Sequence, residues 1–184
     1  MQISYLSSII KQFEYYKSLG DKTFQELNFE ELKKEFAEDS NSIAIVVKHM
    51  VGNMLSRWTN FLTEDGEKAW RHRDQEFEDT YTSKKALIDD WDKGWHCLFE
   101  AITPLTESDL ERIIFIRNQG HTVTEAINRQ LAHYAYHTGQ IVFLGKLLKG
   151  KNWQSLSIPK GDSSKYNAEK FGKEKGRRHF TDDL

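Results

Sequence analysis

Two histidines, His133 and His137, stand four residues apart in the stretch LAHYAYHTGQI. On a helix, side chains at this spacing lie on the same face, with Cβ atoms about 6 Å apart. Two imidazole nitrogens could then reach one metal ion, each at about 2.0–2.1 Å. The pair alone is a weak signal, because two unrelated core or surface histidines give the same pattern. A metal site here therefore needs a further ligand from elsewhere in the chain.

His49 is the candidate for that ligand. It lies in the apolar run IAIVVKHMVGN, where a histidine is either satisfied by a hydrogen bond or used for chemistry. If the helices that carry His49 and His133 face each other, three imidazoles can converge on a divalent ion. Three protein ligands leave positions open for a substrate, which is typical of catalytic sites, whereas structural zinc sites are closed by four.

Further polar side chains accompany these histidines. Gln130 and Gln140 lie about one turn before and after the pair, and could hydrogen-bond a ring N–H or a bound water. Asn53 and Arg57 follow His49 by one and two turns, and could hold an anionic group of a substrate. The alternative for Asn53 and Arg57 is structural: the asparagine fills a packing gap, and the arginine pairs with an acid at the surface.

Four amphipathic helical patterns must position these residues. They cover about residues 2–19, 41–63, 84–102 and 123–149. Gly20 is a typical stop signal for the first pattern, and Ser83 is a suitable N-cap for the third. Thr122 or Thr124 can cap the fourth, and Thr122 followed by Glu125 fits a capping box. Between the third and fourth patterns, RIIFIRNQGHTV predicts a small β-hairpin or an extended loop.

The predicted fold class is all-α. Residues 1–150 are expected to form a four-helix bundle with a small β-hairpin or extended excursion before the last helix. Residues 151–184 are expected to form an extended C-terminal tail, packed on the same domain or trailing from it. Within the tail, residues 160–178 carry seven Lys or Arg and three acidic residues. A solvated tail is the preferred interpretation, with a polyanion-binding arm as the alternative.

Composition narrows the class of function. The chain of 184 residues fits a single domain, and its 26 basic and 28 acidic side chains give a net charge of -2. This balance argues against nucleic acid as the main partner, because phosphate binding needs a cationic face. The sequence shows no signal peptide and no membrane span, so we expect a cytoplasmic protein. The single cysteine, Cys97, is interpreted as a buried apolar residue rather than a nucleophile.

The segments that carry the histidines resemble a known superfamily. SIAIVVKHMVGNMLSRWTNFLTEDGEKAWRHRDQEFE and GHTVTEAINRQLAHYAYHTGQIVFLGKLL are similar to segments of the DinB/YfiT-like superfamily, and more narrowly of an uncharacterised branch of it. The closing LSIPKGDSSKYNAEKF is similar to the same branch. The resemblance implies a four-helix bundle of the up-down-down-up type, commonly a homodimer. It also implies a divalent metal held by one histidine of the second helix and two of the last, which match His49, His133 and His137.

The chemistry expected of such a site follows from its open coordination. A divalent Ni, Zn, Fe or Mn ion could activate either water or a thiol. Some members of the superfamily are thiol-dependent transferases or isomerases that use low-molecular-weight thiols, and others are presumed hydrolases. The sequence shows no Glu or Asp that stands out as a general base, which favours transfer of a small thiol to a small electrophile. A metal-dependent hydrolase and a non-catalytic metal-binding or ligand-binding bundle remain the alternatives.

Overall fold

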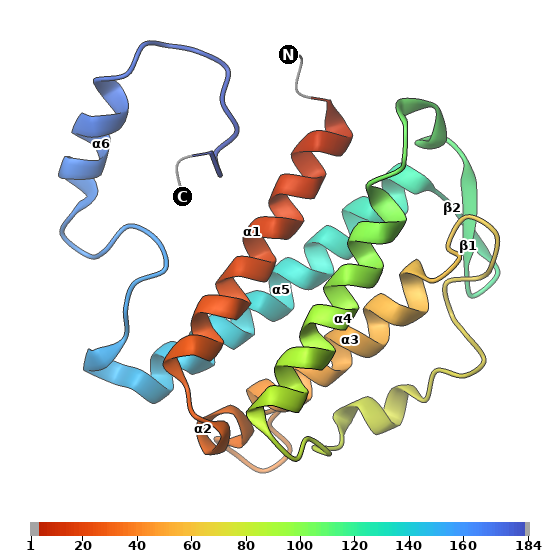
Figure 1. Cartoon of the computed structure of the whole chain (residues 1–184), viewed down its shortest axis with the longest axis horizontal. Helices are drawn as coiled ribbons and strands as arrows, with labels where there is room; N and C mark the ends of the chain where they lie inside the picture. Colours follow the sequence, from red (N-terminus) through yellow and green to blue (C-terminus); the bar gives the residue numbers. More distant parts are fainter. Residues whose placement is uncertain (1–3, 183–184) are drawn as a thin grey trace.

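The computed structural model describes residues 4–182 and is mostly helical, with one small antiparallel sheet (Figure 1). Residues 1–3 and 183–184, which fall in the predicted first helix and tail, lie outside this description. The α-helices are α1 (Tyr5–Glu26), α2 (Phe29–Lys33), α3 (Ile43–Trp58), α4 (Lys84–Ile102), α5 (Val123–Lys149) and α6 (Ser163–Phe171). The strands are β1 (Ile113–Ile116) and β2 (Gln119–Thr122), and the 3-10 helices are η1 (Arg73–Phe77), η2 (Glu107–Asp109) and η3 (Gly150–Asn152).

Side-chain caps fix where the last two long helices begin. The Ser83 hydroxyl accepts a hydrogen bond from the Ala86 backbone N–H, and α4 starts at the next residue. Thr122 and Glu125 form a reciprocal capping box at the start of α5. Each cap satisfies N–H groups that would otherwise lack a partner in the first turn. The bounds predicted for these two helices, 84–102 and 123–149, are therefore confirmed.

The predicted end of the first helix at Gly20 is wrong. Helix α1 continues through Gly20 to Glu26. A Cβ atom at position 20 would lie 2.4 Å from Cζ2 of Trp91 on α4, far inside van der Waals contact. Gly20 therefore allows a tryptophan ring to approach the α1 backbone, and it does not terminate the helix. The cost of glycine inside a helix, about 1 kcal/mol relative to alanine, is accepted for this close packing.

The second helix is shorter than predicted. The sequence pattern indicated 41–63, whereas α3 ends at Trp58. Thr59 takes an extended conformation as the C-cap, and Asn60 has a φ of 49°, in the left-handed region. Asparagine tolerates this region better than most residues, so the chain turns here although apolar residues follow. His49, Asn53 and Arg57 all remain within α3.

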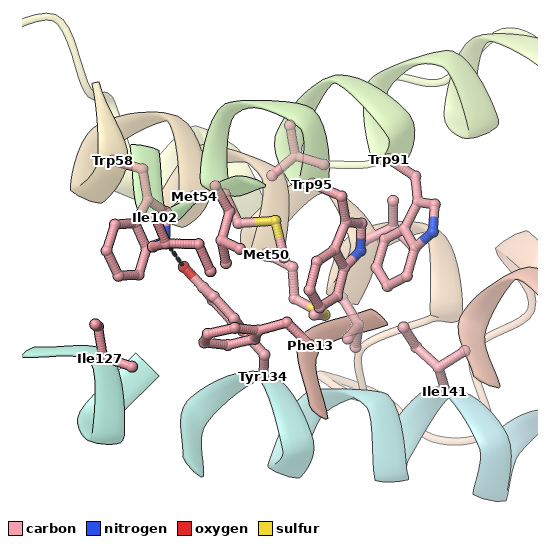
Figure 2. Close-up of a cluster of buried hydrophobic side chains, with 14 of the residues drawn as sticks. Phe13, Met50, Met54, Trp58, Trp91, Trp95, Ile102, Ile127, Tyr134 and Ile141 are labelled. Atoms are coloured by element: carbon pink, nitrogen blue, oxygen red, sulfur yellow. Dashed lines mark hydrogen bonds between the residues drawn. The ribbon is translucent and has the colours of Figure 1, made fainter. Parts of the chain in front are cut away.

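One hydrophobic core joins the four long helices. Helix α3 packs against α4 and α5, and α1 packs along α5 and against α4. Aromatic side chains fill the centre, with Phe13, Trp95 and Tyr134 in mutual contact (Figure 2). The indole N–H of Trp58 donates to the Tyr134 hydroxyl, which donates in turn to Oδ1 of Asn53. This buried polar chain ties α3 to α5 at the level of the histidines.

The excursion before the last helix is a β-hairpin. Strands β1 and β2 pair antiparallel, with Ile113 opposite Thr122 at one end and Ile116 opposite Gln119 at the turn. The two turn residues, Arg117 and Asn118, have φ angles of 55° and 58°. Positive φ at both central positions matches the turn type whose twist suits a two-residue hairpin.

The C-terminal segment is not simply extended, which corrects the prediction for residues 151–184. It contains α6, none of whose residues is buried. Beyond α6 the chain returns to α1, where His179 hydrogen-bonds the Ser8 hydroxyl and Lys11 forms an ion pair with Asp182. Helix α6 was missed because its nine residues are mostly polar and none of them is buried, so few apolar residues marked it as a helix. In the described part of the chain, no helix is long and apolar enough to cross a membrane.

Candidate metal centre

Three imidazoles meet between α3 and α5. The Nε2 atom of His133 lies 3.4 Å from Nε2 of His49 and 3.0 Å from Nε2 of His137. One nitrogen from each ring lies within 4.8 Å of the other two, so the three could share one ion. His49 is buried, and His133 and His137 are half-buried. The structure thus brings together the three histidines that the sequence predicted as ligands.

The spacing between nitrogens suits a small divalent ion. Two nitrogens bound at about 2.05 Å lie about 2.9 Å apart at a right angle and about 3.4 Å apart at a tetrahedral angle. The observed 3.0 Å and 3.4 Å fall at these two values. The donor set therefore fits a metal in which the three imidazoles occupy neighbouring coordination positions.

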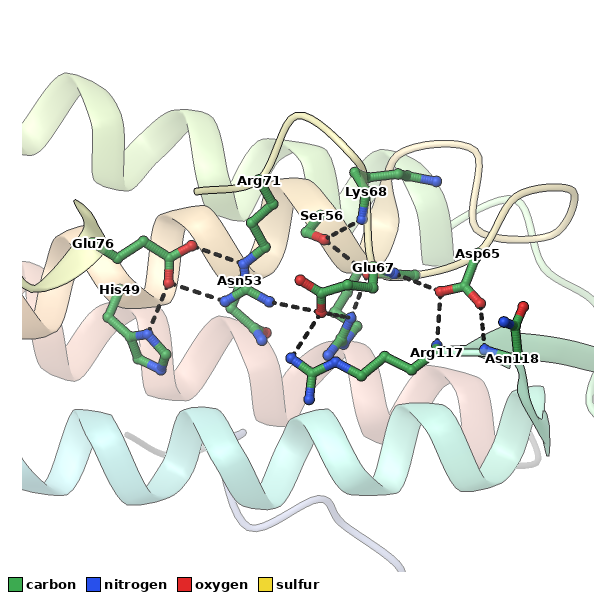
Figure 3. Close-up of polar contacts among 12 residues, drawn as sticks. His49, Asn53, Ser56, Asp65, Glu67, Lys68, Arg71, Glu76, Arg117 and Asn118 are labelled. Carbon is green, nitrogen blue, oxygen red and sulfur yellow. Dashed lines mark hydrogen bonds and ion pairs between the residues drawn. The ribbon is translucent and has the colours of Figure 1, made fainter. Parts of the chain in front are cut away.

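Glu76 fixes the ring of His49. Oε2 of Glu76 lies 3.0 Å from Nδ1 of His49, and Arg71 donates to both carboxylate oxygens at 2.8 and 3.0 Å (Figure 3). Burial alone would raise the pKa of Glu76, but the hydrogen bonds from His49 and Arg71 outweigh burial and lower it. An ionised carboxylate only accepts, so Nδ1 of His49 carries the proton and Nε2 presents its lone pair to the centre. Such a carboxylate partner is typical of metal-binding histidines.

Sequence reasoning missed Glu76, but one signal for it was present. Gly52 lies in the HMVGN stretch, one turn after His49. A Cβ atom on Gly52 would lie 2.3 Å from Oε1 of Glu76. The helix therefore lacks a side chain at the place where the Glu76 carboxylate reaches His49.

Gln140 fixes the ring of His137 in a similar way. Its Oε1 atom lies 2.7 Å from Nδ1 of His137, and its Nε2 donates to the Tyr136 hydroxyl at 3.1 Å. An amide oxygen only accepts, so Nδ1 of His137 donates and Nε2 again presents a lone pair. A proton on Nε2 of His133 could satisfy only one of the two lone pairs that face it, whereas a cation would satisfy all of them. The sequence had named Gln140 as a candidate for this kind of contact.

The surroundings favour neutral imidazoles. Burial lowers the pKa of His133 to about 3, with additional repulsion from His137 and His49. Burial also lowers the pKa of His137. Both rings are therefore uncharged at neutral pH, as metal binding requires.

The other predicted residues lie near the centre in different roles. Asn53 is buried, and its side-chain oxygen accepts the hydrogen bond from Tyr134, so it serves the core. Arg57 is 7% exposed and donates to the Gly66 carbonyl and to Glu67. Gln130 is buried, and its Oε1 has no hydrogen-bond partner within the described residues.

Comparison with known proteins places the chain in a family. A family model described as "Protein of unknown function (DUF1572)" matches residues 1–162, and the chain belongs to that family. No curated protein and no solved structure matches it significantly.

Proposed function

We propose that the protein binds one divalent metal ion through Nε2 of His49, His133 and His137. The observation that carries this proposal is the position of Nε2 of His133, which lies 3.4 Å from Nε2 of His49 and 3.0 Å from Nε2 of His137. Glu76 and Gln140 orient the rings of His49 and His137 through hydrogen bonds with their Nδ1 atoms. The ion is Ni, Zn, Fe or Mn, and the one that loads depends on availability as well as on the ligands.

We further propose membership of the DinB/YfiT-like superfamily, with its up-down-down-up four-helix bundle. The packing among α1, α3, α4 and α5 supports the bundle, and the ligands come from the second and last of these long helices. A homodimer is part of the same proposal. It is supported by a stripe of exposed apolar side chains along α5, where Tyr136, Phe143 and Leu147 are 63%, 66% and 51% exposed.

The reaction we propose is transfer of a low-molecular-weight thiol to a small electrophile in the cytoplasm, with neither nucleic acid nor membrane as a partner. The bound ion would supply the positive charge that holds a thiol as its thiolate near neutral pH. The thiol proton passes to solvent, and the sulfur bonds to the electrophilic carbon. With a chlorinated electrophile chloride leaves; with an epoxide a C–O bond opens and its oxygen takes a proton from solvent.

The carboxylate next to the ligands supports thiol transfer over hydrolysis. Hydrolysis is aided by a base that accepts a proton from the attacking water. Both oxygens of Glu76 are already engaged by His49 and Arg71, and the pKa of this carboxyl is lowered. Glu76 is therefore better suited to orient His49 than to accept a proton. A thiol has a much lower pKa than water before it binds, about 8.5 against about 15.7, so beside the same cation it ionises with less help from a base.

A thermal-shift screen of the metal-loaded protein with several cellular thiols tests this function. A thiol that binds only the folded state at 100 times its Kd stabilises that state by about 2.7 kcal/mol. The expected result is a raised Tm with at least one thiol, followed by its metal-dependent conjugation to a chlorinated or epoxide electrophile. Turnover of an ester or amide without any thiol effect would make the hydrolase correct. If neither result is obtained, the protein is a non-catalytic metal-binding protein.

A further inference from the structure

Three arginines from separate parts of the chain converge on one carboxylate. Arg57 on α3, Arg71 from the loop before η1 and Arg117 from the hairpin turn all contact Glu67 (Figure 3 shows Arg71, Arg117 and Glu67). The contacts measure 3.3, 3.4 and 3.2 Å, and all three go to the same oxygen, Oε2. The three arginines and Glu67 are called the arginine cluster below.

Glu67 satisfies these arginines poorly. A guanidinium pairs best with a carboxylate through two parallel hydrogen bonds at about 2.7–2.9 Å. None of the three contacts has this paired form, and each is longer. The Arg57 side chain is only 7% exposed, and its buried Nε has no hydrogen-bond partner within the described residues. Burial and the neighbouring charge of Arg71 both lower the pKa of Arg57. Arg57 thus has a spare donor, and burial and repulsion from Arg71 outweigh the attraction that it gains from Glu67.

The cluster is held in place by Asp65. Its Oδ1 accepts from the backbone N–H groups of Arg117 and Glu67, and its Oδ2 accepts from that of Asn118, each at 2.8 Å. These bonds fix the turn in which Arg117 takes a positive φ, a conformation that costs energy for a residue with a long side chain. One carboxylate therefore orders both the exposed arginine and the loop that carries Glu67.

The arginine cluster lies next to the metal centre along a continuous chain of contacts. Arg71 contacts Glu67 through Nη1 and contacts Glu76 through Nε and Nη2, and Glu76 bonds the His49 ring. A molecule bound at the cluster would have the metal centre beside it.

We propose that the arginine cluster is a binding site for an oxyanion group, a carboxylate or a phosphate, of the small-molecule substrate, and that Glu67 occupies this site until the substrate displaces it. The inference rests on the proposed function for its role, because the bound oxyanion would direct the remainder of the substrate toward the metal. Glu67 is suited to displacement because its side chain is 24% exposed and is held through a single oxygen.

Titration calorimetry with inorganic phosphate and with succinate tests the inference on the full-length protein, both as isolated and after removal of metal by chelation. Glu67→Gln removes the competing charge and should tighten anion binding about tenfold. Arg117→Ala removes a charged contact to the anion and should weaken anion binding about tenfold. Arg112→Ala is the matched control, because Arg112 is a half-exposed arginine of the same region that pairs with Asp109 outside the cluster. The preferred probe, phosphate or succinate, identifies the group that the substrate carries.

The inference is overturned if neither anion binds, or if Glu67→Gln binds no more tightly than the wild type. It is also overturned if Arg112→Ala weakens binding as much as Arg117→Ala. If the protein proves not to bind metal, the inference about the arginine cluster still stands or falls by itself, because anion binding to the cluster should persist in the metal-free protein. Phosphate binding that disappears with the metal would show that the anion binds the ion and not the arginines.

Discussion

Gly52 and the Glu76 carboxylate occupy adjoining space, such that a Cβ atom on residue 52 would lie 2.3 Å from Oε1 of Glu76. Glu76 in turn bonds Nδ1 of His49 at 3.0 Å. Replacing the side-chain hydrogen of Gly52 with a methyl group would thus disturb the carboxylate that orients His49, although no proposed metal ligand is changed.

Gly52→Ala should displace the Glu76 carboxylate and lower metal affinity. Loss of such a carboxylate partner typically costs about 10–100-fold in affinity. Competition with a chromophoric chelator measures the change. Gly139→Ala is the matched control, because Gly139 also lies in a helix with ligands and a Cβ there would meet nothing within 4 Å. Equal metal affinity in Gly52→Ala and Gly139→Ala would contradict the role assigned to Glu76.

Glu76→Gln should also weaken metal binding by about 10–100-fold, since a neutral amide polarises the His49 ring less than a carboxylate does. Glu78→Gln, which changes an exposed carboxylate two residues away, should leave the affinity unchanged. The same chelator competition gives both values, and circular dichroism confirms that each variant is folded. If both glutamine variants bind metal as the wild type does, the carboxylate does not tune His49.

Cys97 should be a poor nucleophile in the folded protein. Burial raises the pKa of its thiol, and the neighbouring Thr59 hydroxyl only partly offsets this effect. Because the thiolate is the reactive form, alkylation by iodoacetamide at pH 7 should be slow in the folded protein and much faster in denaturant. Cys97→Ser should retain any thiol transfer. Loss of turnover in a folded Cys97→Ser variant would show that the chain supplies its own thiol.

The metal-free protein should lose stability as the pH falls from about 6.5 toward 3. Burial lowers the pKa of His133 from 6.5 to about 3 in the folded state, so in this window the unfolded chain binds more protons than the folded one. The free energy of unfolding therefore decreases with decreasing pH. Urea unfolding between pH 7 and pH 4 measures the slope, and His133→Gln should flatten it. An identical slope in wild type and variant would contradict the burial of a neutral imidazole at this position.

The sequence was sufficient to find the three ligand candidates because helical spacing is a local property. His133 and His137 are one turn apart, and His49 interrupts an apolar run. The start of α5 was likewise predictable, because Thr122 and Glu125 lie close together in sequence and cap the helix by themselves.

Features that depend on tertiary contacts could not be predicted in the same way. Gly20 has the sequence signal of a helix end, yet it serves the approach of Trp91 from another helix. Glu76 lies in a loop crowded with charged residues, and its partner His49 is 27 residues away. Nothing local distinguishes Glu76 from Glu78, so only the glycine at position 52 pointed to a close neighbour.

The most direct test of the metal centre is elemental analysis of the purified protein. The wild type should carry close to one Ni, Zn, Fe or Mn per chain, and His49→Ala combined with His133→Ala and His137→Ala should carry none while remaining helical. A second variant, His72→Ala with His96→Ala, removes two exposed histidines and should keep the metal. Equal metal content in the wild type and the triple ligand variant would contradict the account.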